Sequence, residues 1–122
     1  RSLVNLAGTA GSMVLFQRGG STLTAVELER IIDMSRLLDS RILSDVCIKL
    51  VGPSATSGDA SVNYSIALNR AETVAQQFRT RLTRPERLIE VASEGETKPR
   101  PDFPGSDARN RRVEVWLKPC VS

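Results

Sequence analysis

The chain has 122 residues, of which 40% are hydrophobic, 25% charged and 4% aromatic, and it carries a formal net charge of +3. This length and composition fit one globular domain whose core is filled mainly by Leu, Ile and Val. The sequence contains no histidine and only two cysteines, which excludes a Ser-His-Asp or Cys-His catalytic unit and a zinc site of the usual kind.

The chain is expected to enter the fold through a short strand and a helix. Residues 1–12 are small and mixed and are interpreted as a lead-in segment, whereas 13–17 (MVLFQ) form an apolar run short enough for a buried strand. Helical spacing then predicts a helix over 24–40, which starts with a capping box of Thr24 and Glu27. Its apolar positions are Leu28, Ile31, Ile32 and Leu38.

A second strand and a long helix follow. In 45–52 (DVCIKLVG) apolar and polar residues alternate, which predicts a strand that Gly52 and Pro53 close. A loop containing Ser and Gly leads to a helix that starts near Asp59 or Ser61 and ends before Pro85. The apolar stripe of this helix is expected to consist of Ala67, Ala71, Val74, Ala75, Phe78 and Leu82.

Two strands and a proline-rich loop complete the chain. Residues 87–95 (RLIEVASEG) are interpreted as a core strand, and the three prolines within 97–108 indicate a loop. Residues 111–118 (RRVEVWLK) form the last strand, in which alternation directs one set of side chains inward and the other outward. The inward set is Val113, Val115 and Leu117, and the outward set is Glu114, Trp116 and Lys118. Packing of Trp116 against the N-terminal segment is favoured over contact with a partner.

The predicted fold class is an α/β protein, more narrowly an α+β two-layer sandwich, with elements in the order β-α-β-α-β-β. Strands that alternate with helices imply right-handed crossovers and two main helices packed on a mixed four-stranded sheet. Because no helix separates the last two strands, they could pair antiparallel. No window of the sequence is long and apolar enough to span a bilayer. Any membrane contact is therefore expected through a segment outside this chain.

Three local patterns occur in order along the chain. The first is the strand that ends in Phe16 ahead of a helix. The second is a loop and helix, and the third is 94–99 (EGETKP) followed by 110–114 (NRRVE). The loop and helix of the second pattern carry Gly52, Gly58, Asn63, Arg70 and Ala71. Together the patterns resemble the OmpA-like domain, the C-terminal module of outer-membrane protein A, which also occurs in the peptidoglycan-associated lipoprotein and in MotB. The resemblance assigns 13–119 to one such domain.

The resemblance implies a non-catalytic domain that binds peptidoglycan. Family members hold the diaminopimelate of the stem peptide between a loop aspartate and a helix arginine, because a zwitterion needs a carboxylate for its ammonium and a guanidinium for its carboxylate. Arg70 matches the helix arginine, Asn63 matches the asparagine that trims the loop, and Arg111 with Arg112 matches the basic pair that flanks the pocket. The candidate binding residues are Arg70, Asn63, Arg111, Arg112, Ser54 and Asp59.

The acidic half of this pattern is missing. Ala55 stands where the resemblance expects the loop aspartate, and Gln17 replaces the acid after the first strand. Losing a charge-assisted hydrogen bond to the ammonium would cost about 1.5–3 kcal/mol. Asp59 is expected either to replace the missing acid or to cap the second helix. Without the motif, Asn63 would cap loop amides and Arg70 would pair with a surface acid.

Two functions are weighed for the chain. The first is a peptidoglycan-binding anchor domain of a Gram-negative envelope protein, such as a lipoprotein, in the periplasm and associated with the outer membrane. The alternative, which Ala55 favours, is a degenerate domain that serves as a structural subunit of an envelope-spanning secretion or conjugation complex. Envelope proteins are expected partners, and no cofactor or metal is expected. Scattered arginines without an aromatic platform argue against nucleic-acid binding, and no acid/base pair can be assembled for an enzyme.

The two cysteines leave a choice open. Cys47 and Cys120 are far apart in sequence and could form one disulfide in an oxidising compartment. They could equally remain two unpaired thiols, one in a strand and one near the C-terminus, because the number of cysteines alone does not decide.

Overall fold

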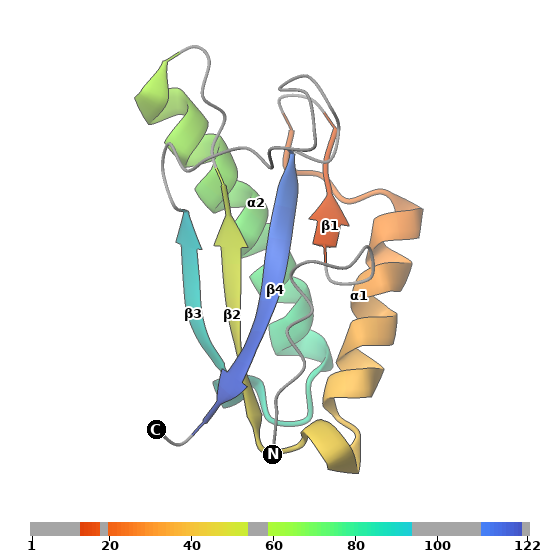
Figure 1. The fold of residues 1–122 in the computed structure, drawn as a ribbon. Helices are drawn as coiled ribbons and strands as arrows, with labels where there is room; N and C mark the ends of the chain where they lie inside the picture. Colours follow the sequence, from red (N-terminus) through yellow and green to blue (C-terminus); the bar gives the residue numbers. More distant parts are fainter. Residues whose placement is uncertain (1–12, 18–19, 54–58, 94–110, 121–122) are drawn as a thin grey trace, which may run out of the picture.

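The fold contains the strands and helices that the sequence predicts, in the predicted order. The computed structural model describes residues 13–17, 20–53, 59–93 and 111–120. They form β1 (Met13–Leu15), α1 (Ala25–Leu38), β2 (Val46–Gly52), α2 (Ala60–Arg81), β3 (Leu88–Ser93) and β4 (Arg112–Pro119), with short 3-10 helices at Arg41–Leu43 and Pro85–Arg87 (Figure 1). Within these ranges, no helix has the length and apolar character needed to cross a membrane.

The strands form one mixed sheet in the order β1-β4-β2-β3. β4 pairs antiparallel with β1 and β2, and β3 pairs parallel with β2. The suggested antiparallel pairing of the last two strands is therefore wrong. Val113 and Val115 are fully buried, which suits a strand that is hydrogen-bonded along both edges. Ile89 and Glu90 are exposed, which fits the position of β3 at an edge of the sheet.

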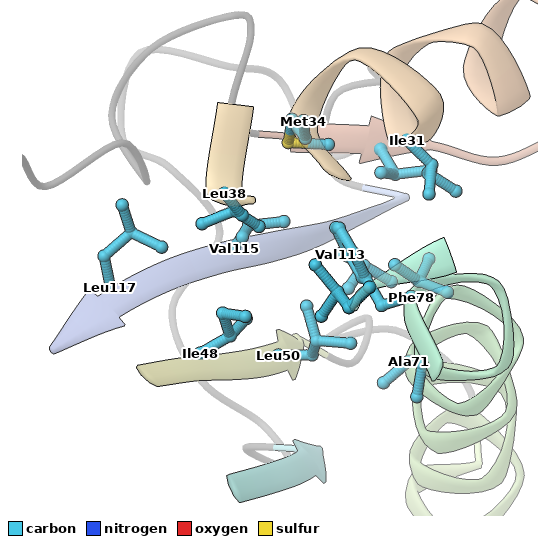
Figure 2. Packing of buried hydrophobic residues seen from close by; sticks show 14 of the residues in the cluster. Ile31, Met34, Leu38, Ile48, Leu50, Ala71, Phe78, Val113, Val115 and Leu117 are labelled. Atoms are coloured by element: carbon cyan, nitrogen blue, oxygen red, sulfur yellow. The ribbon is translucent and has the colours of Figure 1, made fainter. Parts of the chain in front are cut away.

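Both helices cover one face of the sheet and enclose the hydrophobic core (Figure 1). Figure 2 shows Ile31 and Leu38 of α1 and Phe78 of α2 directed at the central strands. The predicted alternation of β4 is confirmed, because its apolar side chains are buried whereas Trp116 is exposed. The predicted stripe of α2 is also confirmed, because all of its members are buried: Ala67, Ala71, Val74, Ala75, Phe78 and Leu82.

The buried face of α1 differs from its predicted stripe. Ile31 is buried as expected, but Leu28 and Ile32 are only half-buried, and Met34 and Ser35 are buried instead. α1 lies at the margin of the sheet, where its main neighbours are β1 and α2. Its inward face is therefore set by contacts with those two elements, which the apolar spacing alone does not reveal.

Glu27 also faces inward, and its carboxylate accepts a hydrogen bond from the edge strand β1. Its backbone N–H donates to Thr24 Oγ1 at 3.3 Å, so the predicted N-cap contact forms. The carboxylate, which a full capping box would return to Thr24, instead accepts the backbone N–H of Leu15 at 2.9 Å and Arg30 Nε at 3.2 Å. β1 is an edge strand, so this contact satisfies a main-chain donor that β4 does not reach.

The two cysteines are bonded, which settles the choice left open by the sequence. Cys47 near the start of β2 and Cys120 just after β4 form a disulfide with a Cα–Cα distance of 4.8 Å. Cys47 alternates with Val46 and Ile48 of the core, so the bond lies on the sheet face opposite the helices. It ties the last strand to the second one across 73 positions of sequence.

Candidate functional site

Arg70 is a buried cation in the third turn of α2. Its side chain is only 7% exposed. Its Nε donates to the carbonyl of Gly20 at 2.8 Å, and its Nη2 donates to the carbonyl of Gln17 at 3.2 Å. The guanidinium carbon also lies 5.7 Å from the centroid of the Phe16 ring. Arg70 therefore ties α2 to the turn after β1 and retains further N–H groups for a ligand.

Close packing of α2 against the sheet sets the position of Arg70. Gly52, the last residue of β2, approaches the helix so closely that a Cβ added there would lie 2.4 Å from the carbonyl oxygen of Ala67. Ala67 and Ala71 flank this contact and are fully buried. Small side chains on both elements let the backbone of α2 lie near the end of β2. Arg70 follows one turn after this contact and points toward β1.

Arg111 joins Arg70 at this end of the sheet. Its Nε donates to the carbonyl of Phe16 at 3.1 Å, and the backbone N–H of Phe16 donates to the carbonyl of Arg111 at 2.8 Å. The pKa of Arg70 is lowered first by burial and second by the positive charge of Arg111. Neither arginine forms an ion pair with a carboxylate among the described residues. Two guanidinium groups thus lie close together, and the part of the chain that the structure describes pairs neither of them with an acid.

A second buried arginine at the opposite end of the sheet provides a contrast. Arg87 is 3% exposed and donates to the carbonyls of Val46 and Leu43 at 2.8 and 2.6 Å. Its Nη1 also lies 3.8 Å from Asp39 Oδ1. Burial and Arg84 lower the pKa of Arg87, and nearby acids, Asp39 first among them, raise it. The fold therefore pairs one buried arginine with acids, whereas Arg70 lies beside another cation.

Asp59 takes the role of a helix cap, the second of its two predicted roles. Its Oδ1 accepts the backbone N–H groups of Ser61 and Val62 at 2.9 and 3.2 Å and the Ser61 hydroxyl at 2.6 Å. The Ser61 hydroxyl is the largest cause of the lowered pKa of Asp59, and the two backbone donors add to it. The carboxylate is thereby engaged at the N-terminus of α2.

Of two further candidate residues, the structure describes Asn63 but not Ser54. Asn63 is half-buried in the first turns of α2, two turns before Arg70, and its backbone N–H donates to the carbonyl of Asp59 at 3.0 Å. Ser54 and Ala55 lie outside the described residues. Arg70 and Arg111 are therefore the candidates that the structure brings together.

Arg112 lies on the other face of the sheet. Its Nε donates to Glu114 Oε2 at 2.7 Å, and Glu114 Oε1 accepts the indole N–H of Trp116 at 3.0 Å. Val113 between them is in the core, so the two-residue period of β4 sends Arg112 away from Arg70 and Arg111 toward it. The sequence already predicts this alternation. It does not predict the carbonyls that accept hydrogen bonds from Arg70, because every residue type has a main-chain carbonyl.

Known structures share this fold. The peptidoglycan-associated lipoprotein from Burkholderia pseudomallei matches with a TM-score of 0.74 at 19% identity, over 88% of this chain and 90% of that one. The OmpA-like domain of FopA1 from Francisella tularensis matches with a TM-score of 0.72 at 22% identity, over 88% of this chain and 73% of that one. A putative MotB-like protein from Desulfovibrio vulgaris matches with a TM-score of 0.66 at 26% identity, over 87% of this chain and 70% of that one.

These matches define the class of fold. No protein-family model matches the sequence, and no curated protein matches it. The chain has the fold of an OmpA-like domain, as the three local patterns predicted. Identities this low establish the fold, so the function has to be argued from the residues of this chain.

Proposed function

We propose that this domain binds peptidoglycan without catalysis and holds the carboxylate of the stem-peptide diaminopimelate on Arg70 and Arg111. The observation that carries the proposal is the charge of Arg70, which is 7% exposed and whose partners among the described residues are main-chain carbonyls and a phenyl ring. A carboxylate would accept its remaining N–H groups and relieve the repulsion from Arg111. The arrangement offers positioned donors for an anion, and the described residues around it include no nucleophile hydrogen-bonded to a base.

Two further features support an envelope location. A solved structure with the same fold is named a peptidoglycan-associated lipoprotein, and others are periplasmic domains of MotB. The Cys47–Cys120 disulfide suits an oxidising compartment such as the periplasm. The proposed location is therefore the periplasm, in association with the outer membrane, where protein partners of the envelope would also be available.

A second candidate function is favoured by Ala55. A domain that lacks the loop acid would hold only the carboxylate of a zwitterion, and its affinity for the wall would fall about ten- to a hundred-fold. Such a domain could be retained as a structural subunit of an envelope-spanning secretion or conjugation complex. The two candidates differ in one measurable property, which is binding to the intact wall.

Co-sedimentation with insoluble diaminopimelate-type peptidoglycan tests the proposal. The proteins compared are the wild type, Arg70→Ala, Arg111→Gln and Ala55→Asp. Arg36→Gln is the matched control, because it removes one positive charge from a side chain that is 78% exposed on α1. Circular dichroism establishes that each variant is folded, which matters most for Arg70→Ala because it leaves two carbonyls without their donor.

The outcomes separate the two functions. Pelleting of the wild type and of Arg36→Gln, with loss in folded Arg70→Ala and weakening in Arg111→Gln, supports the wall-binding function. If the wild type stays in the supernatant and Ala55→Asp pellets, the domain has given up wall binding and the structural role is supported. If no protein pellets, the site does not bind the wall in either form.

A further inference from the structure

The charges described at the Arg70–Arg111 site are both positive. Both guanidinium groups hydrogen-bond to main-chain carbonyls, which are those of Phe16, Gln17 and Gly20. No carboxylate among the described residues pairs with either group. The pKa of Arg70 is lowered first by burial and second by the positive charge of Arg111. The loop 54–58 (SATSG) adds no acidic residue to the sequence between β2 and α2.

Two acids of neighbouring elements have other hydrogen-bond partners. The carboxylate of Asp59 accepts the N–H groups that open α2. The carboxylate of Glu27 accepts Leu15 N–H and Arg30 Nε on the outer side of β1. An ammonium carried next to a bound carboxylate would meet two guanidinium charges, neither of which is paired with an acid among the described residues. Such an ammonium is repelled, whereas a neutral group in its place is not.

We infer that this site selects a carboxylate whose neighbouring amine is acylated over the same carboxylate beside a free ammonium. The inference rests on the proposed function and names the chemical form of the wall that the site takes. Each stem-peptide diaminopimelate carries an amine next to its side-chain carboxylate, and a cross-link through that amine converts it to a neutral amide. The carboxylate remains available, so a cross-linked stem presents the anion without the opposing charge.

The inference predicts a preference that small soluble ligands can measure. Titration calorimetry of the whole chain compares an uncross-linked muropeptide with its cross-linked dimer, and free diaminopimelate with its mono-N-acetyl derivative. The acylated member of each pair should bind roughly fivefold or more tightly at low ionic strength, and the ratio should shrink as salt screens the repulsion. The affinity of the dimer is expressed per stem peptide whose diaminopimelate amine is acylated by the cross-link.

Two variants connect the preference to the arginines. Arg111→Gln removes one repelling charge and leaves the contacts of Arg70 in place, so it should weaken both ligands and reduce the ratio between them. Arg36→Gln lowers the net charge by the same amount on the exposed side of α1 and should leave both affinities and their ratio unchanged. Equal effects of the two variants would trace the preference to overall charge and overturn the inference.

The remaining outcomes distinguish this inference from the proposed function. If both members of a pair bind and the acylated one binds more tightly, both proposals stand. If the free zwitterion binds equally or more tightly, wall binding stands but the selectivity is overturned, and an acid from 94–110 would be sought beside the site. If neither member binds while the protein is folded, the proposed function fails and the inference fails with it.

Discussion

Reduction of the Cys47–Cys120 disulfide should remove a large part of the stability of this domain. A bond that spans 73 positions restricts the unfolded chain, and loop-closure entropy gives a contribution of about 4 kcal/mol. Domains of this size are stable by about 5–15 kcal/mol in total. Reduced protein should therefore melt about 10–20 °C lower than oxidised protein. It should remain folded at room temperature, because the sheet and core do not depend on the bond for their contacts.

Urea unfolding of the oxidised and reduced protein measures this effect. The fluorescence of Trp116, the one tryptophan of the chain, and far-ultraviolet circular dichroism report the transition. The denaturant slope m should rise on reduction, because the unfolded chain becomes less compact and exposes more surface. The exposed Cys120 can be replaced without a cavity, so Cys120→Ser should reproduce the reduced protein. A loss below about 1 kcal/mol, or an unchanged m, would refute the view that the bond acts on the unfolded state.

Three further substitutions test the packing and the caps. Gly52→Ala should destabilise the domain by about 1–3 kcal/mol in urea unfolding, because the new methyl group would meet the carbonyl of Ala67 at 2.4 Å; wild-type stability would show that α2 can shift away freely. Arg87→Ala should cost about 3 kcal/mol, because two carbonyls lose a buried donor, and a loss under about 1 kcal/mol would mean that water replaces the guanidinium. The lowered pKa of Asp59 means that its cap stabilises the fold above the usual carboxyl range and is lost as the pH falls below it. Asp59→Asn keeps a capping side chain that does not titrate, so its melting temperature should fall less between neutral and acidic pH than that of the wild type; identical pH profiles would contradict the assignment.

Much of the fold was predictable because local patterns determine it. Alternation identified β2 and β4, and helical spacing with a cap at each start identified α1 and α2. The place of β4 between β1 and β2 was not predictable, because strand pairing depends on contacts between distant segments that no local pattern records. The partner of the Glu27 carboxylate was predicted wrongly for a related reason. The capping-box pattern predicts a partner at the start of the same helix, whereas the carboxylate accepts the backbone N–H of Leu15 in β1.

The candidate site was predictable in part. Arg70 followed from the motif, and its acceptors did not, because they are main-chain carbonyls of the turn after β1. Arg111 and Arg112 were treated as a pair, although a strand sends consecutive side chains to opposite faces and the buried Val113 already indicated which one faces Arg70. Ser54 stays a prediction, since it lies outside the described residues.

The central position of β4 also determines when the sheet can form. Among the described strands β1 pairs only with β4. The strands that come first and last in the sequence therefore pair late, after residues 112–119 have become available. A shorter nascent chain holds β2 and β3 joined through α2, with β1 unpaired. Contacts of such long sequence separation form slowly. For a chain exported to the periplasm, as proposed, the sheet can be completed only once residues 112–119 have crossed the membrane, in the compartment where the disulfide can then close.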